Sequence, residues 1–437
     1  MPALLLRRSK LRPASRLFSS SRFDAVICGG GVMGSSSAYH LAARAPGMRI
    51  AVIERDNAYK HASAMLSAGG IRQQFSLREN VLMSLYGADM LRDPSGLAVD
   101  EEVPDLQFIE RGYLFLAPEQ ADGQPESILR SNHAVQQEAG ATGVRLLNRE
   151  ELRAQFPWMH LDDIALGAFG AKDEGSFDPW AMLQAMKRKA LSLGNVTYIN
   201  GEVRGLTGAN GKLTGVTYAP CSRSGPGDTL ETLECGTVVN AAGAFGAGVV
   251  EMAGAALGRP VAPLPVAPRK RSIFIMHVPD GVPEGAPLIV DPCGVYVRPE
   301  GKGARFLCGV SPPADQDPDC RDNDDLDVVQ CDLFDEVVWP ALYERCEAFG
   351  NGKQVACWAG FYDYNTVDQN GIIGPHPDVP NLILCNGFSG HGLQQAPAAG
   401  RAVAELVADG QFQAIDLHRF RFERFADGEL ALERNIV

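Results

Sequence analysis

The feature that most constrains the fold is a glycine-rich turn near the start of the sequence. The apolar segment Ala25–Cys28 predicts a buried strand, and a helix of small residues through Ala45 follows the turn. In such a turn Gly29 lets the chain reverse, Gly31 lets the backbone approach a pyrophosphate, and Gly34 lets helix and strand pack closely. Amides at the helix start carry a partial positive charge toward phosphates. The pattern therefore predicts a strand–turn–helix unit that binds a nucleotide.

The end of the next predicted strand narrows the class of nucleotide. Residues Arg49–Ile53 predict a second strand, and Glu54 follows at the spacing where a carboxylate accepts both ribose hydroxyls of an adenosine. Glu54 disfavours NADP, although Arg55 comes directly after it and is a candidate cofactor contact. The unit alone does not separate FAD from NAD, so a soluble NAD-dependent dehydrogenase stays an alternative at this point.

A second glycine-rich turn near the C-terminal end favours FAD. Residues Asn381–Cys385 predict a buried strand, and a helix is predicted to run through Leu406. The candidate cofactor contacts between them are Gly387, Ser389, Gly390, His391, Gly392 and Leu393. Amides at the start of such a helix stabilise negative charge on a reduced flavin ring. An NAD-dependent dehydrogenase would not require this second turn.

These segments together resemble the D-amino-acid oxidase-like superfamily of FAD-dependent oxidoreductases over residues 24–410. The resemblance includes residues 67–72 and the strand and turn of residues 238–244. It implies further FAD contacts at Ser67, Gly69, Gly70, Ala242 and Gly243. It also implies non-covalent binding of FAD, because the positions that carry the covalent links in sarcosine oxidase and dimethylglycine dehydrogenase align near Phe361 and Ser67. Cys357 lies close enough to the first of these to keep a covalent link open.

The fold that this resemblance implies is α/β and has two intertwined parts. A Rossmann-like FAD-binding domain is expected from residues 23–112, 175–262 and 355–437. An interleaved substrate domain with a mixed sheet is expected from residues 113–174 and 263–354.

The resemblance carries candidate catalytic residues, but it also shows departures from the family pattern. Arg72 matches an arginine close to the flavin ring, and His391 and Tyr362 are the other candidates. His391 is either a proton-transfer base or a group that orients the backbone, and Tyr362, Tyr364 and Arg298 either face the substrate or pack in strands. The cations that hold a substrate carboxylate in sarcosine oxidase correspond to Phe75 and Gln394, which disfavours a simple amino acid bound in the usual pose. Leu307 stands where sarcosine oxidase has a lysine that promotes reaction with oxygen, which favours a dehydrogenase or no turnover.

The N-terminal end predicts a mitochondrial protein. Residues 1–22 contain six Arg and Lys residues and no acidic residue, which is typical of a transit peptide. The net charge of −13, without a later basic cluster, argues against a nucleic-acid surface. No stretch is apolar enough to predict a transmembrane segment, so any attachment to the inner membrane is expected to be peripheral.

Four further segments resemble one mitochondrial member of the family, which is an assembly factor for respiratory complex I. They comprise residues 69–77, 173–180, 266–271 and 358–366. The resemblance implies complex I subunits or assembly intermediates as partners, at the matrix face of the inner membrane. A working FAD-dependent dehydrogenase of a small secondary amine or amino acid is the alternative.

The remaining expectations concern local structure. Strands are expected at residues 111–117 and 295–310, helices at 120–155 and 179–193, and a solvated acidic loop at 312–328. The ten cysteines are scattered and lack metal-ligand spacing, so they are expected to be small core residues, and no metal site is expected.

Overall fold

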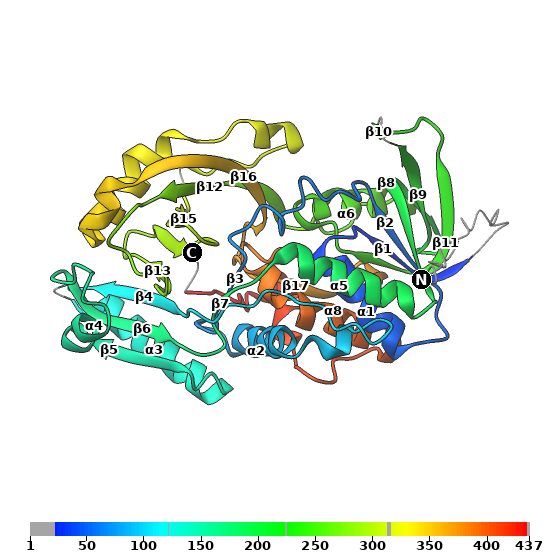
Figure 1. Ribbon diagram of the computed structural model, residues 1–437. Helices are drawn as coiled ribbons and strands as arrows, with labels where there is room; N and C mark the ends of the chain where they lie inside the picture. Colours follow the sequence, from blue (N-terminus) through cyan, green and yellow to red (C-terminus); the bar gives the residue numbers. More distant parts are fainter. Residues whose placement is uncertain (1–21, 121, 223–224, 313–315, 435–437) are drawn as a thin grey trace, which may run out of the picture.

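The computed structural model describes residues 22–120, 122–222, 225–312 and 316–434. Their main strands form two eight-stranded sheets, which occupy different halves of the molecule and have helices packed against them (Figure 1). The predicted transit peptide lies outside the described residues except for Arg22. Within the described ranges, no helix combines the length and the apolar character needed to cross a membrane.

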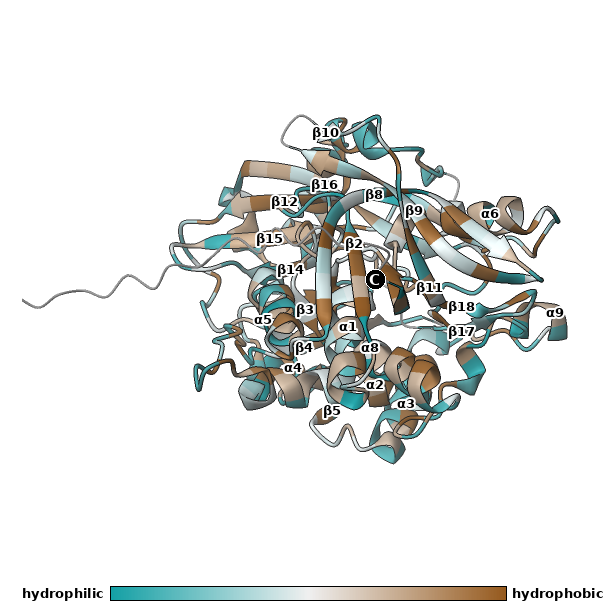
Figure 2. Ribbon diagram, turned by 90° about the vertical axis from the view of Figure 1, so that its right-hand side faces the viewer, coloured by the Kyte–Doolittle hydropathy of each residue, from teal (hydrophilic) through white to brown (hydrophobic). Residues whose placement is uncertain are grey.

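The first sheet is built around the predicted nucleotide-binding unit. Its strand order is β10-β9-β8-β2-β1-β11-β18-β17, and the strands from β8 to β18 in this order run parallel. Its strands are β1 Phe23–Cys28, β2 Ile50–Glu54, β8 Val196–Ala209, β9 Lys212–Ser222, β10 Gly225–Pro226, β11 Glu231–Asn240, β17 Ile372–His376 and β18 Val379–Asn386. Both faces of its centre are covered, which explains the continuous apolar runs of these strands, visible as brown ribbon in Figure 2.

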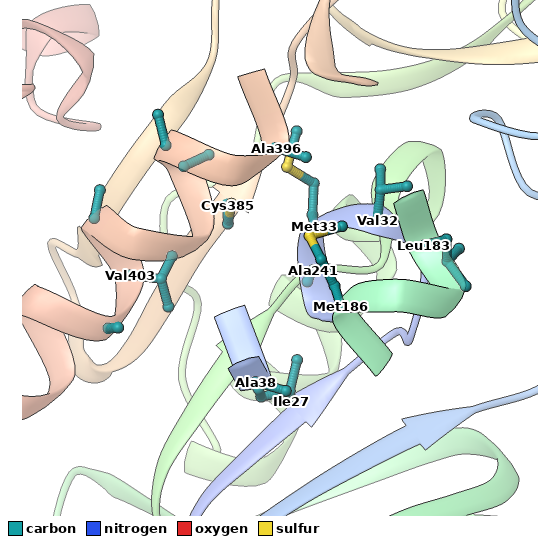
Figure 3. Packing of buried hydrophobic residues seen from close by; sticks show 14 of the residues in the cluster. Ile27, Val32, Met33, Ala38, Leu183, Met186, Ala241, Cys385, Ala396 and Val403 are labelled. Carbon is teal, nitrogen blue, oxygen red and sulfur yellow. The ribbon is translucent and has the colours of Figure 1, made fainter. Parts of the chain in front are cut away.

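The helices that cover this sheet are α1 Val32–Arg44, α2 Arg78–Arg92, α5 Pro179–Ser192, α6 Gly246–Leu257 and α8 Gly392–Asp409. Of these, α1, α5 and α8 have the predicted positions. Successive side chains of β1 point to opposite faces of the sheet. Ile27 packs in a hydrophobic core with α1, α5 and α8, whereas Val26 packs in a second core with α6. Figure 3 shows the first core, in which Ile27 and Ala38 lie on the same side of the sheet as Leu183 and Val403.

The second sheet has the order β16-β12-β15-β14-β13-β4-β6-β5. Its strands are β4 Tyr113–Pro118, β5 Val144–Asn148, β6 Ile164–Gly170, β12 Val266–His277, β13 Leu288–Val290, β14 Tyr296–Pro299, β15 Arg305–Gly309 and β16 Lys353–Asn365. Its helices are α3 Gln124–Ala139, α4 Arg149–Gln155 and α7 Trp339–Arg345. The strands predicted at 111–117 and 295–310 are confirmed.

Short elements complete the described chain. The ribbon β3 Gly70–Ile71 pairs with β7 Gly175–Ser176, and α9 spans Arg424–Asp427. Single turns of helix are η1 Pro94–Leu97, η2 Gly243–Phe245, η4 Asn323–Asp327, η5 Phe334–Val338, η6 Glu347–Asn351 and η7 His418–Phe420.

Some sequence-based expectations need correction. The helix predicted over 120–155 is two helices separated by β5, because Gly140 ends α3 with φ +100° and a capping box of Asn148 and Glu151 starts α4. Strand β16 is an edge strand of the second sheet, whereas the predicted division placed residues 355–365 in the FAD-binding domain. The acidic loop is not wholly solvated, because Asp317 is buried against Arg271.

The cysteines also depart in part from the expectation that they fill the core. Five are buried, at positions 28, 235, 308, 346 and 385. Cys293 and Cys331 are exposed, and the Sγ of Cys331 lies 3.2 Å from the Sγ of Cys357. Sequence spacing could not predict this contact, because it joins a loop to the strand β16.

Candidate functional site

A cavity of about 640 Å³ lies at the carboxyl ends of β1, β2 and β11 and extends to the second sheet. The carboxyl edge of a parallel sheet is where open α/β folds bind their ligands. Its walls come from segments as distant in sequence as Cys28 and Gln394. The two predicted glycine turns and the loop of residues 67–72 meet there.

The first glycine turn lines the cavity at Gly29 and Gly31. Gly29 has φ +98°, and a Cβ on it would collide with the carbonyl of Ala241. A Cβ on Gly34 would collide with the carbonyl of Gly29, so Gly34 serves helix–strand packing and does not line the cavity. Gly31 lines the cavity and has no atom within 4 Å of the position of a Cβ. The backbone at the start of α1 is therefore open to a large ligand group such as a pyrophosphate.

The acid predicted to bind the ribose lies beside this turn. The Oε2 atom of Glu54 accepts a hydrogen bond from the Gly30 amide at 2.7 Å, and Oε1 accepts one from the Asp56 amide at 2.8 Å. Burial raises the pKa of Glu54 above its ordinary value, and these two amides oppose that rise. The Arg55 guanidinium lies 4.4 Å from the centre of the Phe245 ring, and both residues line the cavity. The carboxylate is thus held at the end of β2, where an adenosine would reach it.

The loop of residues 67–72 and the turn between β11 and α6 supply another part of the cavity wall. Ser67, Gly69, Gly70, Ala242 and Gly243 all line it. A Cβ on Gly70 would collide with the Tyr113 hydroxyl, and Gly243 has φ +54° with no atom within 4 Å of a Cβ position. Glycine at these positions keeps the backbone accessible from the cavity.

The C-terminal turn places the start of α8 against the cavity. Ser389, Gly390, His391, Gly392 and Leu393 line it. Gly387 does not line the cavity. Its amide donates to Oδ2 of Asp363 at 2.8 Å, and the Phe388 amide donates to the same atom at 3.1 Å. Burial raises the pKa of Asp363 to about 6. Asp363 fixes the turn that precedes α8, a role that sequence analysis missed because the two segments meet only in the fold.

Arg72 is buried at the centre of the site. Its amide donates to Oε1 of Gln394 at 2.7 Å, and its guanidinium donates to the carbonyl of Gln74. The guanidinium carbon also lies 4.1 Å from the centre of the Phe75 ring and 5.1 Å from that of Phe115. Burial lowers the pKa of Arg72. The two positions that lack the family's cations, Phe75 and Gln394, therefore hold Arg72 in place.

His391 and Tyr362, the other two catalytic candidates, also line the cavity. Burial and the nearby Arg72 lower the pKa of His391 to about 3, so its ring is neutral at physiological pH. Its Nε2 atom lies 3.3 Å from Oδ1 of Asn370. The Tyr362 ring packs closely on Gly390, which has φ +100° and no room for a Cβ beside that ring. This packing connects the second sheet to the C-terminal turn.

The part of the cavity next to the second sheet, which we call the polar chamber, includes residues that the sequence did not single out. Arg271 lines it next to Tyr113, Tyr296 and Tyr362. The Arg271 guanidinium donates to both carboxylate oxygens of Asp317, at 2.7 and 2.9 Å, and lies 4.8 Å from the centre of the Tyr362 ring. The resemblance at residues 266–271 was the available signal, but it does not tell which of three successive cations faces inward.

Other candidates lie outside the cavity. Arg298 donates to the carbonyl of Ala68 at 2.6 and 2.9 Å, so it supports the loop of residues 67–72 without lining the cavity. Tyr364 packs under Arg269, at 4.0 Å from its guanidinium carbon. Cys357 does not line the cavity, and its nearest sulfur partner is Cys331. The structure therefore does not place Cys357 for a covalent bond to a ligand in the cavity.

These residues fit FAD. An open backbone at Gly31, a carboxylate at Glu54 and the start of α8 all line one continuous cavity, where they suit the pyrophosphate, the adenosine and the isoalloxazine of FAD respectively. The start of α8 supplies the partial positive charge that suits a reduced flavin.

Comparisons with known proteins agree with this geometry. The family model described as "FAD dependent oxidoreductase" (DAO) matches residues 24–406. A protein of Xenopus laevis, "FAD-dependent oxidoreductase domain-containing protein 1", is 44% identical over 434 residues, covering 95% of this chain and 85% of its own length. Its Drosophila melanogaster homolog is 36% identical and covers 95% of this chain and 81% of its own length. The crystal structure of L-proline dehydrogenase from P.horikoshii superimposes with a TM-score of 0.78 at 24% identity, covering 94% of this chain and 100% of that one.

Proposed function

Because the chain belongs to the DAO family of FAD-dependent oxidoreductases and uses FAD as its cofactor, we propose that it is a mitochondrial flavoprotein that acts in the assembly or stability of respiratory complex I. Its place of action would be the matrix, including the matrix face of the inner membrane. Its partners would be complex I subunits or assembly intermediates. FAD, bound without a covalent link, would stabilise the fold by mass action whether or not turnover occurs.

The observation that carries this proposal is that Arg72 and Arg271, two cations that line the cavity, are bound by partners within the protein. Arg72 is held by Gln74, Phe75 and Phe115, and Arg271 is held by Asp317. A substrate carboxylate would have to displace internal partners of these guanidinium groups, which costs a buried charge-assisted hydrogen bond each time. The resemblance of residues 69–77 and 358–366 to a mitochondrial assembly factor supports the same proposal. Arg-rich residues 1–22 support the location.

The test uses cells from which the endogenous copy of this gene has been deleted. The amount of assembled complex I is measured on native gels after the wild-type chain or a variant is returned. Loss of complex I on deletion and recovery with the wild-type chain are the expected results. Normal complex I in the deleted cells would contradict the proposal.

The second candidate function is a dehydrogenase of a small secondary amine or amino acid. It is favoured by the polar chamber, where Arg271, Tyr113, Tyr296 and Tyr362 line a space continuous with the cofactor cavity. Bound FAD supplies a hydride acceptor to such a substrate. The chain's own residues would orient the substrate and exclude water from it, with the neutral His391 as a hydrogen-bonding group.

One variant separates the two functions. Tyr362→Phe keeps the ring that packs on Gly390 and removes only the hydroxyl from the chamber. If assembly needs FAD for stability alone, this variant restores complex I as well as the wild-type chain does. If turnover is required, the variant fails in cells and also slows anaerobic bleaching of the purified flavoprotein by proline, sarcosine or dimethylglycine.

A further inference from the structure

The C-terminal strap, residues 429–434, is anchored by a buried polar network. Arg424 and Asp368 form an ion pair in which both side chains are fully buried, with bonds of 2.7 and 2.8 Å. Oδ2 of Asp368 also accepts the amide of Ala431 at 2.9 Å, and Nδ2 of Asn370 donates to the Ala431 carbonyl at 3.0 Å. The strap, drawn in red in Figure 1, is therefore a fixed part of the fold.

Glu433 belongs to this strap, and its side chain lies at the start of α2. Its carboxylate is buried and accepts the Ser76 amide at 2.7 Å and Nδ2 of Asn80 at 2.9 Å. The Leu77 side chain, which precedes α2, makes no capping hydrogen bond to the helix. Glu433 accepts the Leu77 amide at 3.4 Å and places a negative charge beside the N-terminal end of α2, where the helix dipole favours it. The next residue is fixed as well, since the Arg434 amide donates to the Ser76 hydroxyl at 2.9 Å. The position of the carboxylate is thus set by several donors.

The same carboxylate acts on Arg72. The two groups are held on one short segment, because Glu433 accepts the Ser76 amide and the Arg72 guanidinium donates to the carbonyl of Gln74. Burial lowers the pKa of Arg72, and the negative charge of Glu433 opposes that change. Glu174 is a weaker counter-charge at neutral pH, because burial raises its pKa to about 7. Since Arg72 lines the cavity and is held between the rings of Phe75 and Phe115, its place does not depend on Glu433 alone.

The strap also reaches the other flavin-facing group, His391. Because Nδ2 of Asn370 donates to the Ala431 carbonyl, Oδ1 of Asn370 is the atom that faces His391. Oδ1 can only accept, so the neutral imidazole carries its proton on Nε2 and leaves Nδ1 as an acceptor. The strap thereby fixes the tautomer of a residue at the start of α8.

We propose that Glu433 is a positioning residue of the flavin site: it balances the charge of Arg72 and so sets how strongly negative charge on the bound cofactor is stabilised. The proposal rests on FAD binding and is independent of a role in complex I. A positive charge near the ring favours the reduced, more negative flavin. Neutralising Glu433 leaves Arg72 in place with less opposing charge, so the midpoint potential of the bound flavin rises.

The test is a dye-linked reductive titration of the purified, FAD-loaded protein. Glu433→Gln, which keeps the size of the side chain, is expected to raise the midpoint potential. A tenfold change in the equilibrium corresponds to about 30 mV for a two-electron couple. Glu429→Gln is the matched control, because it removes the same charge from the same strap, where Glu429 is exposed and pairs with Arg421 at 2.8 Å. The control is expected to leave the potential unchanged.

Two results would overturn the proposal: a wild-type potential in Glu433→Gln, or an equal shift in Glu429→Gln, which would make the effect one of net charge. If Glu433→Gln does not retain FAD, Glu433→Asp decides. Its carboxylate stands one methylene farther back and is expected to give a smaller rise in potential. An unchanged potential in Glu433→Asp would then contradict the proposal, because a purely structural strap would alter stability without moving the potential.

Discussion

Removing the Asp368 charge should strongly destabilise the protein. The Arg424 guanidinium is fully buried and donates to both Asp368 oxygens, at 2.7 and 2.8 Å. Asp368 also accepts from Nδ2 of Asn365 at 2.7 Å and from the Ala431 amide at 2.9 Å. In Asp368→Asn, one acceptor oxygen becomes an NH₂ group that faces donors, and the guanidinium is left buried without a counter-charge. Breaking a buried pair in this way costs about 3–5 kcal/mol.

The assay is urea unfolding at a fixed excess of FAD, because bound cofactor contributes to apparent stability. Arg424→Met/Asp368→Asn should be less destabilised than the sum of the two single variants, which isolates the pair in a double-mutant cycle. Glu126→Gln is the matched control, since Glu126 pairs with Arg130 on the exposed face of α3 and should matter by about 0.5 kcal/mol or less. A loss below about 1 kcal/mol in Asp368→Asn would refute the view that this pair is shielded from water.

Three further predictions concern the cofactor cavity. Gly390→Ala should raise the dissociation constant for FAD at least tenfold, measured by titrating apoprotein, because its Cβ would collide with the Tyr362 ring at φ +100°; an unchanged constant would show that the ring moves freely. Glu54→Gln should weaken FAD binding by about 1.5–3 kcal/mol in the same titration, and an effect on stability without one on affinity would contradict the ribose assignment. Because burial raises the pKa of Asp363 to about 6 from 3.8, its protonation stabilises the fold fully below about pH 4, and this contribution is lost as the pH rises through about 6. Asp363→Asn should flatten that part of the pH dependence of the urea midpoint, and an unchanged slope would assign it to another group.

The parts of the site that the sequence predicted are those encoded by local spacing. Gly29, Gly31 and Glu54 belong to one strand–turn–helix–strand unit, so their relation is fixed by the elements between them. The C-terminal turn could be predicted equally well, because a buried strand and a long helix flank it. Strands were found where apolar runs are bounded by turn residues, as at 295–310.

What the sequence could not predict depends on which distant segments meet. Asp363 binds the Gly387 amide, and Arg271 pairs with Asp317, across separations that carry no periodic signal. Glu433 reaches Ser76 from the other end of the chain. The error at 120–155 has another cause: apolar spacing continued through Val144–Asn148, and only the φ +100° turn at Gly140 shows that the helix stops.

The order of strands in the first sheet has a consequence for how the protein is made. β11 lies between β1, which begins at Phe23, and β18, which ends at Asn386, and the cavity wall runs on to Gln394. A ribosome synthesises the chain from the N-terminal end, so the central sheet stays incomplete, with an open edge at β11, until nearly all of the chain has emerged. A chain that stops short of α8 lacks the part of the cavity wall that runs from Ser389 to Gln394. We therefore expect FAD loading to follow the pairing of β18 with β11, and the open edge of β11 to need protection from aggregation until then.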